Sequence, residues 1–95
     1  MKLEWTPRAR AERTDDIDYI AQDNPSAALS QLDRIEYQTD MLIQHPEIGR
    51  AGRKQGTREL VISHTPFIVI YRIKGECIEV MRLLRGLQQW PTLKN

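Results

Sequence analysis

The sequence predicts an α+β domain in which a helical pair covers one side of an antiparallel sheet. Two segments with helical spacing of apolar residues, 7–22 and 25–44, each begin at a proline. Three segments rich in β-branched residues follow between 57 and 85. At 95 residues, of which 40% are hydrophobic, the chain has the size of one domain spanning 1–95.

The first element is a short strand over 2–5, where apolar and charged residues alternate as they do in a half-buried strand. Thr6 and Pro7 then predict the start of a helix over 7–22. A threonine hydroxyl can accept a hydrogen bond from an unpaired backbone N–H, and proline fits the first helical position. Because apolar residues are few here, this helix must be stabilised mainly by packing on a neighbour.

Asn24 and Pro25 repeat the start signal, and a second helix over 25–44 follows. One stripe of this helix is apolar or nearly so, at spacings of three and four residues: Ala28, Leu32, Ile35, Thr39 and Leu42. The helix should stop near Gln44, because Pro46 disfavours helical backbone at His45. The short break between the helices predicts an antiparallel hairpin.

A mobile basic loop is predicted over 45–56. Periodicity is lost there, and three glycines interleave with Arg50, Arg53 and Lys54. Charge is unevenly distributed along the chain, and the excess of basic residues begins in this loop. Residues 1–48 hold 5 basic and 10 acidic side chains, whereas residues 49–95 hold 9 basic and 3 acidic ones. Such a distribution favours anionic partners, although it also suits solvated helix faces and strand edges.

Three strands are predicted over 57–62, 67–73 and 76–84 or 76–85. Lys74-Gly75 as a two-residue turn gives a register in which paired residue numbers sum to 149. This register divides the apolar residues between two faces. One face carries Val69, Tyr71, Ile78, Val80 and Leu84; the other carries Ile68, Ile70, Arg72, Cys77, Glu79, Met81 and Leu83.

The second of these faces needs a cover, because one helical hairpin can pack on only one side of a sheet. The C-terminal tail 86–95, a second copy of the chain or another protein could provide it. Arg82 falls on the buried face in this register, which indicates a β-bulge or a register error of one residue.

Several classes of protein are excluded by composition. No apolar stretch approaches the length that spans a bilayer, and the N-terminus lacks the apolar core of a signal peptide, so we expect a cytoplasmic protein without a membrane partner. With a single cysteine and only two distant histidines, we expect no disulfide, no metal and no other cofactor.

The whole chain resembles the RelE/ParE family of toxins from bacterial toxin–antitoxin operons. No single segment is specific, but the order and spacing of several are. They are Glu4-Trp5-Thr6-Pro7, Asp23-Asn24-Pro25 with Ala27-Ala28, Pro46-Glu47-Ile48-Gly49-Arg50, Gly56-Thr57-Arg58-Glu59-Leu60, Pro66-Phe67-Ile68-Val69-Ile70-Tyr71-Arg72 and Met81-Arg82-Leu83-Leu84.

The resemblance implies a toxin that a cognate antitoxin neutralises, in a complex that would bind operator DNA only through the antitoxin. In this family the antitoxin lays a C-terminal segment over the toxin, so we expect it on the second sheet face. The residues expected to contact it are Ile68, Ile70, Met81 and Leu83. The alternative is that Leu87 and Trp90 fold back over this face.

Two branches of the family differ in their targets. RelE-like members cut messenger RNA on the ribosome with basic residues and commonly a His or Tyr near the chain end, whereas ParE-like members poison DNA gyrase. Here Arg85 stands where many members have His, and arginine is a poor general base. We therefore favour gyrase, with target contacts expected at Arg50, Arg53, Lys54, Arg82, Arg85 and Trp90.

A messenger-RNA endonuclease remains the alternative, and Arg58, Arg72 and Arg82 are then the residues expected to stabilise the phosphate. His64 is the imidazole nearest to them in sequence, although an exposed turn residue is the simpler interpretation of it. A third possibility is a module that binds an antitoxin or nucleic acid without toxicity.

Overall fold

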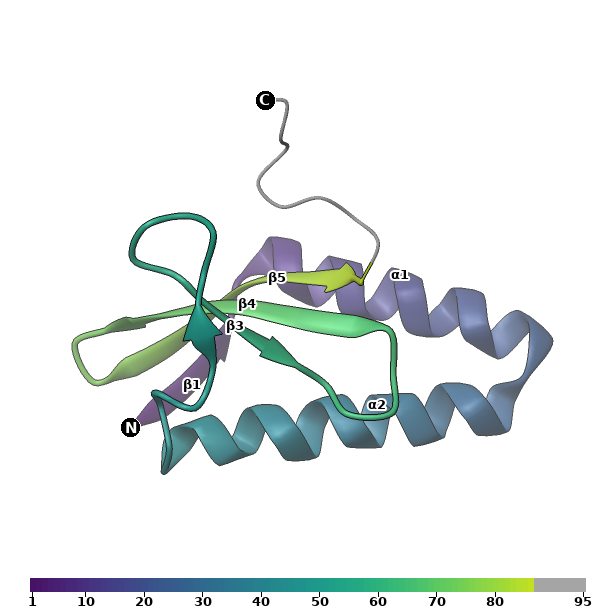
Figure 1. The fold of residues 1–95 in the computed structure, drawn as a ribbon. Helices are drawn as coiled ribbons and strands as arrows, with labels where there is room; N and C mark the ends of the chain where they lie inside the picture. Colours follow the sequence, from purple (N-terminus) through teal and green to yellow (C-terminus); the bar gives the residue numbers. More distant parts are fainter. Residues whose placement is uncertain (87–95) are drawn as a thin grey trace.

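A five-stranded sheet and two antiparallel helices form two layers in the computed structural model, which describes residues 1–86 (Figure 1). The elements in chain order are β1 (Lys2–Trp5), α1 (Pro7–Asp23), α2 (Pro25–Asp40), η1 (Met41–Ile43), β2 (Arg50–Ala51), β3 (Arg58–Val61), β4 (Phe67–Lys74) and β5 (Cys77–Arg85). The strands are ordered β1-β5-β4-β3-β2 across the sheet.

Both helices begin where the sequence predicts. The Thr6 hydroxyl accepts a hydrogen bond from the Ala9 N–H at 3.1 Å, and the Asn24 side-chain oxygen accepts one from the Ala27 N–H at 3.0 Å. Asn24 also terminates α1, since its own N–H donates to the Ile20 carbonyl at 2.9 Å. No helix among residues 1–86 is long and apolar enough to cross a membrane.

The second helix ends as an α-helix earlier than predicted. It closes at Asp40, and the rest of the predicted segment continues as the 3₁₀ turn η1. The Thr39 hydroxyl donates to the carbonyl oxygens of Ile35 and Glu36 at 2.8 and 3.1 Å, within this last turn. A tighter turn of this kind is a common way to end a helix.

The sheet has five strands, because the strand predicted over 2–5 and one strand that was not predicted, β2, join the three predicted for residues 57–85. β1 lies parallel to β5, with Leu3 opposite Ile78 and Trp5 opposite Val80. β2 arises inside the segment predicted to be a mobile loop, where Arg50 pairs with Glu59 in antiparallel fashion. The 45–56 segment therefore contributes the edge strand that lies next to β3.

The predicted register of the β4–β5 hairpin is wrong. Lys74 pairs with Cys77, so paired numbers sum to 151 rather than 149, and the turn lies at Gly75, whose φ is +61°, and Glu76. A shift by two residues leaves every side chain on its predicted face. Arg72 consequently lies directly opposite Glu79.

A bulge in β5 then changes the faces. Tyr71 pairs with Val80 but Ile70 pairs with Arg82, so Met81 is the extra residue. Beyond it Leu83 lies opposite Val69 on the helix side, and Leu84 lies opposite Ile68 on the other side. The predicted faces of Leu83 and Leu84 are thus reversed. Arg82 does not lie on the buried face, because the bulge that its sequence position suggested turns it to the other side.

The core lies between the helices and the inner face of the sheet. Its largest fully buried side chains include Tyr71, Phe67, Ile35 and Leu42. Trp5 and Ile17 pack against it from β1 and α1. Each strand of the hairpin supplies alternate residues to this core, as the sequence pattern predicts.

Each helix supplies one side chain that caps the backbone near an edge of the sheet, and the two caps lie at opposite edges. β1 covers β5 only as far as Val80, and further along the Leu83 N–H donates to Glu12 Oε1 of α1 at 2.9 Å. At the end of β3 the Ser63 N–H donates to Gln38 Oε1 of α2 at 3.0 Å. These helix side chains replace the hydrogen bonds that a neighbouring strand would make.

Candidate functional site

The sheet face opposite the helices, which we call the outer face, carries pairs of charges as well as apolar side chains. It includes Glu59, Val61, Ile68, Ile70, Arg72, Glu79, Arg82 and Leu84. One row runs across four strands, from Arg50 through Glu59 and Ile70 to Arg82. The outer face is more polar than the sequence register suggested, because the bulge places Arg82 and Leu84 on it where Met81 and Leu83 were predicted.

Glu59 anchors the basic segment to this face. Its side chain is 2% exposed, and its two oxygens accept hydrogen bonds from the Arg50 guanidinium at 3.0 Å and from the Arg53 backbone N–H at 3.1 Å. Burial acts to raise the pKa of Glu59, but the hydrogen bonds from Arg53 and Arg50 outweigh it and the pKa lies below its ordinary value. Glu59 therefore orients two cations as a carboxylate.

Tyr71 and Gly49 fix the chain that leads into this segment. The Tyr71 hydroxyl accepts from the Gly49 N–H at 2.9 Å and donates to the Pro46 carbonyl at 2.7 Å. Burial raises the pKa of this phenol. A Cβ on Gly49 would lie 2.6 Å from the Tyr71 hydroxyl oxygen, so only glycine fits. Arg58 donates to the Gly49 carbonyl at 2.9 Å from the other side.

Two further arginines of the outer face are paired with carboxylates. Arg72 Nε donates to Glu79 Oε1 at 2.6 Å. Arg82, whose side chain is 15% exposed, donates from Nε and from a terminal nitrogen to Glu12 Oε2 at 2.9 and 2.6 Å. Both line a groove of about 410 Å³ whose lining residues are Thr6, Arg8, Lys54, Arg72, Glu79, Met81 and Arg82.

Arg85 has different surroundings. It lies opposite Phe67 at the end of β5, its guanidinium is 3.5 Å from Asp16 of α1, and it lies 5.3 Å from the centre of the Tyr19 ring. Burial raises the pKa of Asp16 despite the nearby Arg85, and Glu12 adds to the rise. The ion pairs of Arg82 and Arg85 join the acidic half of the sequence to its basic half.

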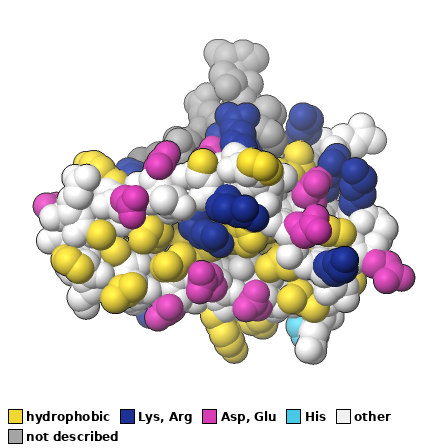
Figure 2. Space-filling model, turned by 180° about the vertical axis from the view of Figure 1, so that it is seen from behind, with side chains coloured by type: hydrophobic (Ala, Val, Ile, Leu, Met, Phe, Trp, Pro, Cys, Tyr) yellow, Lys and Arg dark blue, Asp and Glu magenta, His cyan; other side chains and the backbone are white. Residues whose placement is uncertain are grey.

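The expected target contacts are thus partly brought together. Arg50, Arg53, Lys54 and Arg82 lie on the outer face or in its groove, whereas Arg85 is turned toward α1. Trp90, together with Leu87 and the alternative that the tail covers the sheet, falls outside the described residues. In Figure 2 the Lys and Arg side chains gather over the half of the molecule that holds the sheet.

The residues expected to contact an antitoxin are separated by the fold. Ile68 and Met81 are partly exposed. Ile70 is fully buried, with Glu59 and Arg82 as its neighbours in the register. The prediction for Leu83 is wrong, because the bulge places this side chain in the core beneath the helices, where it is 1% exposed.

The three arginines of the nuclease hypothesis do not form one cluster. Arg72 and Arg82 share the groove, but Arg58 lies opposite Tyr71 and donates to the backbone of the 47–49 segment. His64 is an exposed residue of the β3–β4 connection, with φ of +64°. Among residues 1–86, no three His, Cys, Asp or Glu side chains are grouped so that they could hold a metal ion.

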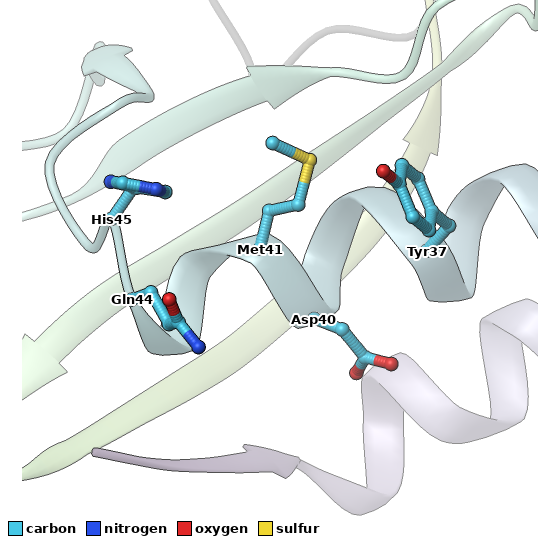
Figure 3. A pocket seen from close by; sticks show the side chains of 5 residues that line it. All are labelled: Tyr37, Asp40, Met41, Gln44 and His45. Carbon is cyan, nitrogen blue, oxygen red and sulfur yellow. The ribbon is translucent and has the colours of Figure 1, made fainter.

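A second hollow, of about 420 Å³, was not foreseen from the sequence. Its lining residues belong to α2, η1 and the residues that follow: Tyr37, Asp40, Met41, Gln44 and His45. Figure 3 shows Tyr37 and Met41 pointing to one side of the helix. Tyr37 is 70% exposed, so the periodicity that marks the buried stripe gives no signal for this surface.

Comparison with known proteins gives consistent results. A family model described as ParE toxin of type II toxin–antitoxin system, parDE, matches residues 3–90. The chain is 41% identical over 91 residues to the "Putative toxin Y4kP" of Sinorhizobium fredii, covering 95% of this chain and 93% of that protein. It is 29% identical over 89 residues to Toxin RelE3 of Caulobacter vibrioides, covering 92% and 96%.

A solved structure is also similar. It is described as the chromosomal ParDE TA system from P. aeruginosa, and the matching chain superposes with a TM-score of 0.81 at 30% sequence identity. The match covers 90% of the present chain and 95% of the other.

Proposed function

Because this chain belongs to the family of ParE toxins of type II toxin–antitoxin systems, we propose that it stops growth by binding DNA gyrase and that a cognate antitoxin neutralises it. Gyrase inhibition in this sense is a binding event that stalls a cleaved DNA intermediate. The contacts would come from the basic residues of the outer face, and from Arg85 with the chain that follows it.

One observation supports this proposal above the others. Arg50 and Arg53 are held by the buried carboxylate of Glu59, and Lys54 and Arg82 line the adjacent groove. Four cations from β2, the β2–β3 connection and β5 therefore lie on one face. Oriented cations on a rigid sheet favour association with an anionic complex such as an enzyme holding DNA.

The same face suits the antitoxin. Ile68 and Met81 offer partly exposed apolar surface between the charged pairs. We propose that a C-terminal segment of the antitoxin covers these two residues with apolar side chains and places acidic side chains near Arg50 or Arg72. Binding there would block the contacts to the target by occupying the same surface.

Two reactions run on one preparation test the target. Purified toxin is added to gyrase with relaxed plasmid, and in parallel to ribosomes translating a defined message. We expect loss of supercoiling with trapped DNA breaks, and intact message. Cut message with unaffected gyrase would replace the proposal with ribonuclease action by Arg72 and Arg82.

A growth assay tests toxicity itself. Induction of the chain without its antitoxin should arrest growth, and coexpression of the antitoxin should restore it. Normal growth with abundant folded protein would mean that the chain binds its partner without acting as a poison.

A further inference from the structure

We propose that the groove between β4, β5, the β2–β3 connection and the first turn of α1 binds the phosphodiester backbone of a nucleic acid, with Arg72 as its principal phosphate ligand. The inference goes beyond the proposed function, because it gives the chain its own site for a nucleic-acid backbone, which binding to gyrase does not by itself require.

The groove collects cations from four separate segments of the chain. Arg8, Lys54, Arg72 and Arg82 line it together with a single carboxylate, Glu79. Glu12 adds a second negative charge where it pairs with Arg82. The surroundings of the groove are therefore net positive, and a concave positive surface concentrates anions more strongly than scattered surface charges do.

Arg72 is held in a way that leaves its terminal nitrogens available. Its Nε donates to Glu79 Oε1 at 2.6 Å, and this contact fixes the plane of the guanidinium. Its two terminal NH₂ groups donate to no atom of residues 1–86, and the side chain is 42% exposed. Two parallel N–H donors on an oriented guanidinium match the oxygens of a phosphate.

The other groups of the groove suit an extended anion. Arg8 is 69% exposed and its guanidinium is 3.9 Å from Glu12, which is too long for a strong contact. Met81, the extra residue of the bulge, lines the groove beside Arg72 and Arg82 and supplies apolar surface. A backbone of alternating phosphates and sugars presents both kinds of surface, whereas a single small anion does not.

The test uses the full chain and labelled oligonucleotides without gyrase or ribosomes. A 20-base-pair DNA duplex and an RNA strand of the same sequence are titrated by fluorescence anisotropy over a series of salt concentrations. With the better of the two, we expect Arg72→Ala to bind about tenfold more weakly and to lower the slope of log affinity against log salt by about 1. Arg72→Lys keeps the charge but not the paired donors and should fall between.

Arg34→Ala is the matched control, since it removes one exposed arginine from α2, far along the sequence from every residue of the groove. It should leave affinity and slope unchanged, and circular dichroism confirms that all variants fold. Equal weakening by both alanine variants would overturn the proposal in favour of diffuse attraction. So would binding of polyglutamate of matched charge as tightly as nucleic acid, or no binding by the wild type.

The two arms identify the source of the phosphodiester, since preference for the duplex points to DNA and preference for the single strand points to RNA. A wild-type chain that binds neither but still inhibits gyrase would refute the groove and leave the proposed function intact. A chain that binds nucleic acid through Arg72 but leaves gyrase unaffected would support the groove and refute the proposed function.

Discussion

Glu12 and Arg82 form an ion pair that connects the first helix to the bulged strand. Both Arg82 hydrogen bonds go to one carboxylate oxygen, at 2.6 and 2.9 Å, and the other oxygen accepts the Leu83 N–H. One side chain thus neutralises the cation that the bulge displaces from the core and satisfies the backbone beside it. The contact joins residues 70 positions apart.

Replacing Glu12 should destabilise the fold. Glu12→Ala leaves Arg82 without this partner and the Leu83 N–H without an acceptor, and we expect a loss of about 2 kcal/mol in the free energy of unfolding. Urea denaturation measures it. Arg8→Ala removes only the exposed contact to the same carboxylate and should change stability by less than about 0.5 kcal/mol. Equal effects would mean that the pair of Glu12 and Arg82 adds nothing to stability.

Acid should weaken the fold through Glu59. Because its pKa is lower in the folded chain, the stabilisation is complete above about pH 4.5, the ordinary value, and is lost as the pH falls through the lowered pKa. Glu59→Gln should therefore be less stable than the wild type at pH 7, and the difference should shrink in acid. Unfolding midpoints from pH 7 to pH 3 test this, and a constant difference would contradict it.

Antitoxin binding should depend on Met81. Met81→Glu would bury a charge without a partner beneath the antitoxin segment, so we expect the dissociation constant to rise about tenfold or more. Ile73→Glu is the control, because that residue is exposed near the end of the hairpin. Titration of both variants with the antitoxin decides, and an unchanged affinity of Met81→Glu would exclude this face.

Ile70 gives a different expectation from the one its sequence position suggests. It is 0% exposed within the toxin, so Ile70→Glu should lower the free energy of unfolding itself rather than act only on the complex. Thermal unfolding of the variant without antitoxin shows this directly.

Toxicity should require the end of the chain. We expect Arg85→Ala combined with deletion of 87–95 to abolish growth arrest while the antitoxin still binds. Asp16→Asn separates mechanism from folding, since it removes the carboxylate partner of Arg85 but keeps both Arg85 and the tail. If that variant also loses toxicity, the contact between α1 and β5 explains the effect and the tail does not.

The helices and most strands could be predicted because their signals are local. A capping side chain followed by proline marks the start of each helix, and β-branched runs mark β3, β4 and β5. Strand β2 could not be predicted in this way, since two residues carry no periodicity and its pairing depends on the buried Glu59. The face of Leu83 depends on the bulge, where Thr6 and Glu12 of a distant segment bind the backbone of β5.

The charged site was predicted only as a list of residue types. The arginines are correctly singled out, but two of them have partners far away in sequence: Glu12 is 70 positions from Arg82, and Asp16 is 69 positions from Arg85. Whether an arginine faces a groove, a carboxylate or the backbone is decided by the register. Arg58 illustrates this, because the residue opposite it is Tyr71 and not another arginine.

The caps supplied by Glu12 and Gln38 bear on what happens when the toxin is released alone at high concentration. Unpaired strand edges are the usual templates for intermolecular β-assembly. Here a carboxylate and an amide oxygen accept hydrogen bonds from the backbone N–H groups of Leu83 and Ser63, near opposite edges of the sheet. These two donors are therefore closed to an incoming strand, so we expect neither position to start intermolecular β-assembly when the chain is alone.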